Sequence, residues 1–429
     1  MCRIITIICY VLLPWAVMAQ TVGNEGVTVG NEIADDSTLV AGFMDDSLAI
    51  DTTRVMPWEE AVKYRMETLL QSELFKTTQV GLMVWDLTAD SALFAYNHQQ
   101  RMRPASTMKL LTSITALDLL GGNHQFTTEL RYRGKIEGHT LWGDLQCVGG
   151  MDPSFDNGDL KMFIDRIRMA GIDTIRGRIV ADKSWKDDLL LGEGWCWDDD
   201  NPVLSALLVG RKDNFVERLE RELNNVGVVF AFTNDSISSS SPKDGGGGII
   251  ASCSHSLDHI LNRMMKQSDN LYAESVFYHI GAAAGRPATA KNARAAVKRL
   301  ISRLGFDAAN YTVADGSGLS LYNYVSPELL VAFLRYAHQK SNIAGYLRPS
   351  LPTAGADGTL QSRMKGTKAQ YNVRAKTGTL TGISSLAGYL FAPNGHDVCF
   401  AIINQGVISS RHGKAFQDRV CAALCTPSE

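Results

Sequence analysis

The sequence predicts an α+β fold, a sandwich of helices on an antiparallel sheet, with an α/β domain inserted into it. Three adjacent strand-like runs at 372–379, 385–391 and 398–404 indicate the sheet, since a Pro-Asn-Gly turn joins the last two. Upstream, strand and helix patterns alternate over a long stretch, which indicates the insertion. With 429 residues, 45% of them hydrophobic and 20% charged, the chain is long enough for two domains.

The N-terminus predicts export. Residues 1–19 combine an early arginine, a largely apolar core from Ile4 to Ala16, and small residues before Gln20, which is typical of a cleaved signal peptide. This core is too short to span a membrane comfortably, and no cysteine follows it directly, so neither a membrane anchor nor a lipid anchor is expected. Residues 20–56 repeat short acidic motifs and predict a disordered linker.

Ordered structure is expected to begin at Pro57. A helix follows it, then a hairpin with strands at 80–86 and 93–96. A second helix starts at Ser106, where apolar residues recur every three or four positions until Gly121-Gly122.

The next segment, 121–245, is expected to be the inserted domain, because 162 positions separate Ser106 from Ser268, far more than a link between neighbouring motifs needs. Its expected elements are strands at 126–132, 141–148 and 175–181 and helices at 160–170 and 216–226. A run rich in Ser and Gly closes it, with the composition of a linker. The main domain would then comprise 57–120 and 246–429. Its later expected elements are helices at 257–265, 290–304, 327–337 and 414–424.

Charge and cysteine content exclude some functions. A net charge of −3 and a pI near 6.3 provide no basic patch, so nucleic acid is not an expected partner. The six cysteines beyond the signal peptide are scattered and predict buried apolar residues rather than a disulfide framework. Cys421 and Cys425 have helical i,i+4 spacing, which allows a cross-link but favours one small apolar helix face.

The most informative stretch is the start of the helix at Ser106. Lys109 follows three residues later, so both side chains lie on one face, beside the backbone N–H groups of the helix start. A serine nucleophile with a lysine base is built in this way. Alone the pattern is weak, because a capping serine one turn before a solvated lysine is common.

Two later stretches of the sequence strengthen the prediction of a serine nucleophile with a lysine base. Ser268-Asp269-Asn270 and Lys376-Thr377-Gly378 follow in the order that penicillin-binding proteins and serine β-lactamases share. Three motifs in one order predict a serine enzyme that forms an acyl-enzyme. Without their companions, Asn270 would be interpreted as a helix cap and Lys376 as a solvated strand residue.

The residues that flank the three motifs indicate a particular protein family more specifically than the motifs alone. The chain resembles, over roughly 58–425, the D-alanyl-D-alanine carboxypeptidase/endopeptidase family of low-molecular-mass penicillin-binding proteins, the carboxypeptidase B type. The segments that carry the resemblance are Arg103 to Thr112, Gly149 to Pro153, Ser268 to Glu274, Asp315 to Ser320 and Ala375 to Gly382. It implies the transpeptidase-like fold of serine β-lactamases, a periplasmic location, peptidoglycan stem peptides as substrate and acylation by β-lactam antibiotics. No cofactor or metal is expected. A serine β-lactamase and a non-catalytic penicillin-binding scaffold remain the alternatives.

The resemblance also implies roles. Ser106 would attack the carbonyl of the penultimate D-alanine while Lys109 accepts its proton, and the N–H groups of Ser106 and Thr379 would form the oxyanion hole. Ser268 would relay the proton to the leaving amine, and Asn270 would hold the substrate amide. Lys376 and Thr377, followed by Gly378, would bind the terminal carboxylate.

Two departures and two less certain residues accompany the resemblance. A further β-rich domain that family members carry within the insert is expected to be absent. Cys196 stands where the family usually has proline. In the family, an acidic residue of the same segment is thought to line the subsite for the diaminopimelate side chain of the substrate. The resemblance therefore makes Asp199 a candidate for substrate binding. Arg363 is a second candidate, for a substrate carboxylate, with a structural ion pair as the alternative.

Three other patterns have structural interpretations. Residues 220–224 match the Glu-x-x-Leu-Asn loop of class A β-lactamases, but they precede the Ser-Asp-Asn motif and predict an amphipathic helix. His255 and His259 have the spacing of a zinc pair without its glutamate, and are expected to be surface residues of the helix before Ser268. Asp152 before Pro153 predicts a turn.

Overall fold

The computed structural model describes residues 56–196, 201–231 and 246–428. The predicted signal peptide, the linker up to residue 55 and Asp199 therefore lie outside the described residues. Within these three ranges, no helix is both long enough and apolar enough to cross a membrane.

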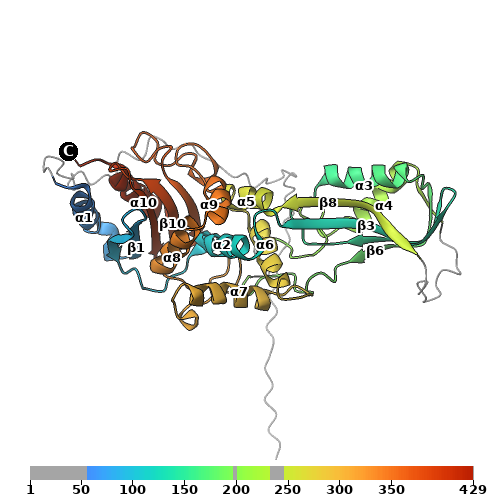
Figure 1. The fold of residues 1–429 in the computed structure, drawn as a ribbon, viewed down its shortest axis with the longest axis horizontal. Coiled ribbons are helices and arrows are strands. Elements are labelled where there is room, and N and C mark those ends of the chain that lie inside the picture. The colour runs from blue at the N-terminus through green and yellow to red at the C-terminus, as the bar shows by residue number, and fades with distance from the viewer. Residues whose placement is uncertain (1–55, 197–200, 232–245, 429) are drawn as a thin grey trace, which may run out of the picture. The chain divides into compact units, whose positions relative to one another are not determined.

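A five-stranded antiparallel sheet organises the part of the chain that holds the sequence motifs (Figure 1). The strand order is β2-β1-β11-β10-β9, so β9 lies at an edge. The hairpin and the three C-terminal strands were all expected, and the strands form within a few residues of the predicted positions. Their bounds are β1 Gln79–Asp86, β2 Ser91–Tyr96, β9 Arg374–Leu380, β10 Ile383–Phe391 and β11 Asp397–Gln405.

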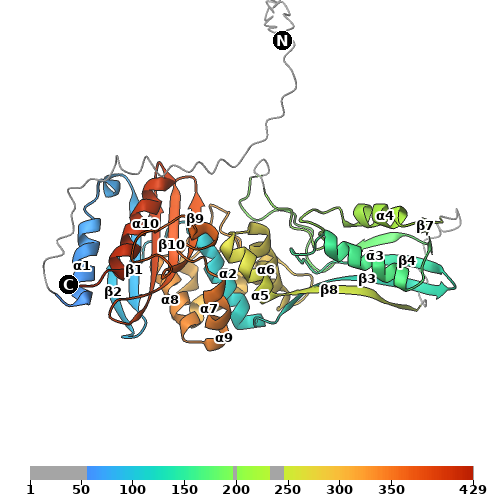
Figure 2. The ribbon, with the colours of Figure 1, turned by 90° about the horizontal axis from the view of Figure 1, so that it is seen from above.

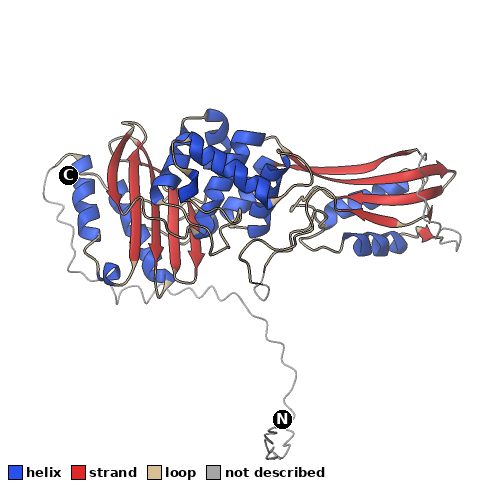
Figure 3. Ribbon diagram, turned by 90° about the horizontal axis from the view of Figure 1, so that it is seen from below, coloured by secondary structure: helices blue, strands red, loops and turns tan. Residues whose placement is uncertain are grey.

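Helices cover both faces of this sheet (Figures 2 and 3). Because successive side chains of a strand point to opposite faces, Phe400 and Ile402 pack towards α1 (Trp58–Leu69) and α10 (Ser410–Cys425), whereas Ala401 and Ile403 pack towards the other helices. Those helices are α2 Met108–Leu120, α5 Leu257–Lys266, α6 Asn270–Ala282, α7 Ala290–Arg303, α8 Pro327–His338 and α9 Ser341–Ser350. The sandwich of helices on an antiparallel sheet is confirmed.

Helices α6 and α9 were not anticipated from the sequence. Every residue of α6 from Leu271 to Gly281 is buried, so this helix has no polar stripe and shows no amphipathic period. Helix α9 contains Pro349, which normally indicates a helix end. Burial on all sides removes the periodic signal of α6, whereas Pro349, one residue before the end of α9, indicates only where that short helix stops.

A second, mixed sheet lies between α2 and α5 in sequence. Its order is β7-β5-β4-β3-β8, with β6 paired to β4. The long strands β3, β4 and β8 are antiparallel, while β5, β6 and β7 join in parallel. Helices α3 Asn157–Met169 and α4 Phe215–Asn225 pack on this sheet. The strands are β3 Gln125–Glu137, β4 Thr140–Val148, β5 Thr174–Arg176, β6 Ile179–Asp182, β7 Val229–Phe230 and β8 Gly247–Ser256.

The end of the inserted segment differs from the expectation. A boundary at 245 placed the glycines that follow it in a linker, yet β8 pairs with β3 along its length and belongs to the second sheet. The inserted segment therefore extends to Ser256. Its junction with helix α6 is packed by a separate apolar cluster, which includes Met151 and Leu204 of the insert and Leu271 and Tyr278 of α6.

Candidate active site

Ser106 lies in a 3₁₀ turn, Ala105–Thr107, which leads directly into α2. Ala105 has a φ of +47°, a conformation that costs a non-glycine residue energy and is common where function requires it. The turn is held from two sides. Thr107 donates its hydroxyl to the carbonyl of Pro104 (2.7 Å), and Ser385 of β10 donates to the same carbonyl (2.6 Å).

Lys109 lies one turn along α2 and is completely buried. Its Nζ donates to three oxygens: Ser106 Oγ at 3.0 Å, Asn270 Oδ1 at 2.8 Å and the Ser317 carbonyl at 2.8 Å. The Oδ1 atom of Asn270 and the carbonyl oxygen of Ser317 can only accept from this nitrogen. If Lys109 loses a proton, its lone pair therefore faces the serine hydroxyl, the one partner that is able to donate.

A second lysine completes the centre. Lys376 of β9 is also completely buried, and its Nζ donates to Ser268 Oγ (2.9 Å) and to the Thr377 carbonyl (2.8 Å). Ser268 occupies the short link between α5 and α6 with a φ of +58°, a second left-handed residue at the site. All three motifs thus meet, although the sequence separates them widely.

Asn270 is placed by the start of α6. The preceding residue, Asp269, caps this helix by accepting from Leu271 N at 3.1 Å. Asp269 also pairs with Arg211 and with Arg263, which lies 3.0 Å from it. Asn270 is therefore the first residue of a helix whose N-terminus is anchored on both sides.

The turn at 315–320 supplies the remaining contacts with the site. Glu274 of α6 is buried and accepts from Ser317 N at 2.7 Å, which presents the Ser317 carbonyl to Lys109. Asp315 accepts from Gly318 N and Ser320 N at 2.8 and 2.7 Å. The sequence indicated the turn but not these roles, because they depend on contacts with α2 and α6.

Burial dominates the electrostatics of the two lysines. It lowers the pKa of Lys109 to about 8, while the carboxylates of Asp315, Glu274 and Asp269 oppose that shift. Burial also lowers the pKa of Lys376 well below its usual value, and the charge of Lys109 lowers it further. Repulsion between two ammonium groups is mutual, so the pair disfavours double protonation. Burial and the neighbouring Asp315 raise the pKa of Glu274 to about 8.

The edge strand β9 carries the Lys-Thr-Gly motif against the serine turn. Thr377 Oγ1 donates to Thr359 Oγ1 at 2.8 Å, and Thr379 is exposed. A Cβ on Gly378 would lie 2.9 Å from Ser106 N and closer still to Ser385 Oγ, so only glycine lets the strand approach Ser106 this closely.

Comparison with known proteins decides the family. The family model described as the D-Ala-D-Ala carboxypeptidase 3 (S13) family matches residues 62–208 and 209–425. The chain belongs to this family. A D-alanyl-D-alanine carboxypeptidase of an Actinomadura species is 28% identical over 458 residues, covering 84% of this chain and 83% of that protein. The resemblance stated from the sequence is confirmed.

A further carboxypeptidase and two solved structures are similar to this S13 carboxypeptidase as well. The D-alanyl-D-alanine carboxypeptidase DacB of Haemophilus influenzae is 26% identical, covering 77% of this chain and 86% of the relative. The crystal structure of penicillin binding protein 4 from that organism has a TM-score of 0.73 at 24% identity, covering 83% of this chain and 98% of that chain. A predatory endopeptidase from Bdellovibrio bacteriovorus matches with a TM-score of 0.53 at 19% identity, covering 81% and 94%. The fold is therefore the transpeptidase-like fold.

Within this S13 carboxypeptidase, Arg363 adopts the structural alternative. Its guanidinium donates to Asp418 at 2.6 Å, to the Lys414 carbonyl at 2.9 Å and to Gln417 at 3.1 Å, all on α10. These contacts hold the segment between α9 and β9 against the C-terminal helix, so the Arg363 guanidinium is occupied by a structural ion pair. Asp199 lies outside the described residues, and its role stays a prediction.

The remaining patterns also have definite places. Residues 220–224 lie within α4, whose buried residues Phe215, Leu219 and Leu223 pack on the second sheet, as expected for a structural helix. Cys421 and Cys425 are free thiols on the buried face of α10. His255 differs from the expectation: it lies on β8 rather than on the following helix, because β8 continues pairing with β3 up to Ser256.

Proposed function

We propose that this chain is a periplasmic D,D-peptidase. It cleaves D-alanyl-D-alanine, D-alanyl-diaminopimelate cross-links of peptidoglycan, or both, through an acyl-enzyme on Ser106. One observation carries the proposal: a buried Lys109 lies 3.0 Å from Ser106 Oγ, and its other two partners can only accept. That arrangement suits proton removal from the serine hydroxyl and acylation by a D-alanine carbonyl or a β-lactam.

The acylation step follows from the contacts of Lys109. Neutral Lys109 takes the proton of Ser106 while the oxygen attacks the carbonyl carbon of the penultimate D-alanine. The developing oxyanion lies at the N-terminal turn of α2, where the Ser106 N–H and the Thr379 N–H are proposed to donate to it. Asn270 then orients both the lysine and the substrate amide.

Departure of the terminal D-alanine requires a proton on its amine. Ser268 is suited to relay that proton, since its hydroxyl accepts from Lys376 at 2.9 Å within the same cluster. The terminal carboxylate of the substrate would lie by Lys376 and Thr377, and its negative charge favours the protonated form of Lys376. Substrate binding thereby restores the charge that burial disfavours.

The position of β9 supports a peptide substrate. It is the edge strand of the five-stranded sheet, and beyond the bridge between Thr353 and Arg374 its outer side has no strand partner among the described residues. An extended stem peptide adds to such an edge by main-chain hydrogen bonds. Asp199 is proposed to meet the ammonium of the diaminopimelate side chain, as the family resemblance implies.

Digestion of purified peptidoglycan tests this function. The mature protein should release free D-alanine, shorten cross-linked dimers to monomers, or do both, and the masses of the products distinguish the two activities. Fluorescent penicillin should remain attached to the protein. Rapid turnover of penicillin without peptidoglycan cleavage would instead identify a β-lactamase, and neither activity would identify a binding scaffold.

A further inference from the structure

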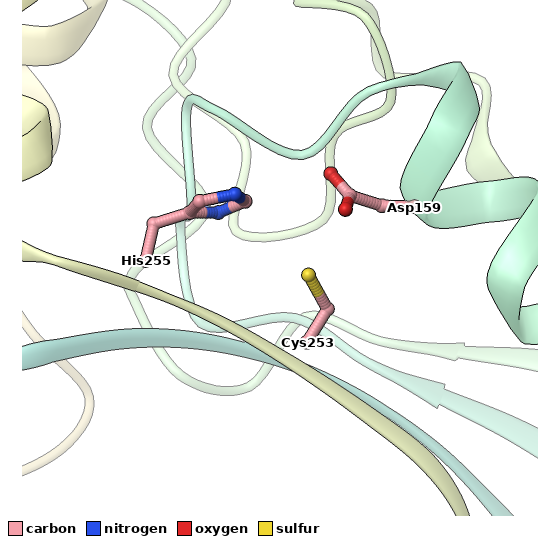
Figure 4. Close-up of side chains that lie close together, drawn as sticks. All are labelled: Asp159, Cys253 and His255. Carbon is pink, nitrogen blue, oxygen red and sulfur yellow. The ribbon is translucent and has the colours of Figure 1, made fainter.

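Three side chains of types that commonly bind metals lie close together beside the second sheet. The proposed peptidase chemistry does not use this part of the chain. Asp159 lies in the first turn of α3, and Cys253 and His255 lie two residues apart on β8, so their side chains share one face of that strand. Figure 4 shows the three side chains facing one another. Their candidate ligand atoms all lie within 4.8 Å of one another.

We propose that Asp159, Cys253 and His255 form a zinc site. A thiolate, an imidazole and a carboxylate form a borderline-soft ligand set that suits Zn²⁺ and disfavours Mg²⁺ or Ca²⁺, which prefer oxygen alone. In a tetrahedral zinc site neighbouring ligand atoms are about 3.5 Å apart, so the ligand atoms need to approach one another by at most about 1.3 Å. Water would take the fourth position.

A buried carboxylate orients the histidine. Asp152 is only 1% exposed, and its Oδ2 lies 2.7 Å from His255 Nδ1. A proton on Nδ1 then leaves the lone pair on Nε2 for an ion, the carboxylate–histidine arrangement that accompanies zinc sites. His259 stacks on the same ring, with centroids 5.1 Å apart. The two histidines are thus not a ligand pair: one is a ligand and the other packs against it.

The surroundings favour a cation. Burial raises the pKa of the Cys253 thiol, and so do its hydrogen bond to Asp159 and the negative charges of Asp159, Asp152 and Asp156, which a cation in this position would offset. The His255 side chain is 22% exposed, which gives an ion access from solvent. An ion here would join the start of α3 to the end of β8. Since α5 begins at Leu257 directly after β8 and leads to Ser268, the site would brace the segment next to the catalytic centre.

Metal titration of the mature, untagged, chelator-stripped protein tests the proposal. Zn²⁺ alone, measured by equilibrium dialysis and elemental analysis, should bind at one ion per chain and raise the melting temperature. Co²⁺ should give a thiolate-to-cobalt charge-transfer band. Cys253→Ser should abolish that band and weaken zinc binding at least 100-fold, while the matched control Cys196→Ser, at an exposed cysteine, should retain both.

A second pair of variants separates ligation from folding. Asp152→Asn should keep the cobalt band but weaken zinc binding 10- to 100-fold, because it removes the orienting carboxylate. His255→Gln should weaken binding further. Covalent labelling by fluorescent penicillin reports the fold of each variant. Zinc binding that is unchanged in folded Cys253→Ser and His255→Gln, or a cobalt spectrum without a thiolate band, would overturn the proposal.

Discussion

The rate at which a β-lactam acylates this protein should rise with pH as Lys109 loses its proton, and should level off once this lysine is neutral. Burial lowers the pKa of this lysine to about 8. A base with that pKa is about one tenth neutral at pH 7, half neutral at pH 8 and nine tenths neutral at pH 9. Acylation should therefore quicken about fivefold between pH 7 and 8 but only about twofold between pH 8 and 9.

The variant Lys109→Arg tests whether proton loss from Lys109 causes this rise of the acylation rate with pH. Arginine retains the positive charge but does not give up its proton at these pH values, so acylation should fall by several orders of magnitude while the protein stays folded. Lys291→Arg, at an exposed lysine of α7, is the matched control and should acylate normally. The comparison separates the loss of a base from the general effect of a lysine-to-arginine change.

Stopped-flow or quenched labelling with a fluorescent penicillin gives the acylation rate from pH 6 to 10. After correction for hydrolysis of the free antibiotic, these rates form the pH–rate profile. Its apparent pKa belongs to Lys109 and Lys376 together, since the two charges repel. A flat profile, or a rate that still rises tenfold per pH unit beyond pH 9.5, would refute a lowered pKa. Near-normal acylation of Lys109→Arg would show that the base lies elsewhere.

Four further outcomes are expected. Ser106→Ala should abolish penicillin labelling and leave the melting temperature within a few degrees; persistent labelling would mean another nucleophile. Gly378→Ala should slow acylation at least 100-fold and cost about 1–3 kcal/mol of unfolding free energy, because its methyl group meets Ser106 N, the Pro104 carbonyl and Ser385 Oγ; unchanged kinetics of the folded variant would contradict the close approach. Arg363→Ala should cost about 2 kcal/mol of unfolding free energy in urea, because it leaves a half-buried carboxylate unpaired, with labelling of the folded protein retained; weak binding of penicillin instead would argue for a substrate contact. Asp199→Ala should lower activity on stem peptides with a free diaminopimelate amine more than it lowers acylation by penicillin, and equal losses would indicate a structural role.

Local sequence was sufficient for the catalytic motifs. Ser106 and Lys109 share a helix face because of the helical period alone, and the later motifs are recognisable from three adjacent residues each. Strands β9 to β11 were predictable because short turns join apolar runs. Helix α6 was not, since a helix buried on all sides loses the amphipathic pattern. The end of the insert was also misplaced, because strand pairing with β3 overrides the glycine-rich composition of β8.

By itself the sequence determined the family, the order of the motifs and the sandwich architecture, and it predicted which residues carry the chemistry. Only the tertiary structure decided what surrounds Lys109, because its partners Asn270 and Ser317 lie 161 and 208 positions away in the chain. It also assigned Arg363 to an ion pair and brought Asp159 to Cys253 and His255. Such contacts depend on how helices and sheets pack, and no local pattern encodes the distance between segments that meet only after folding.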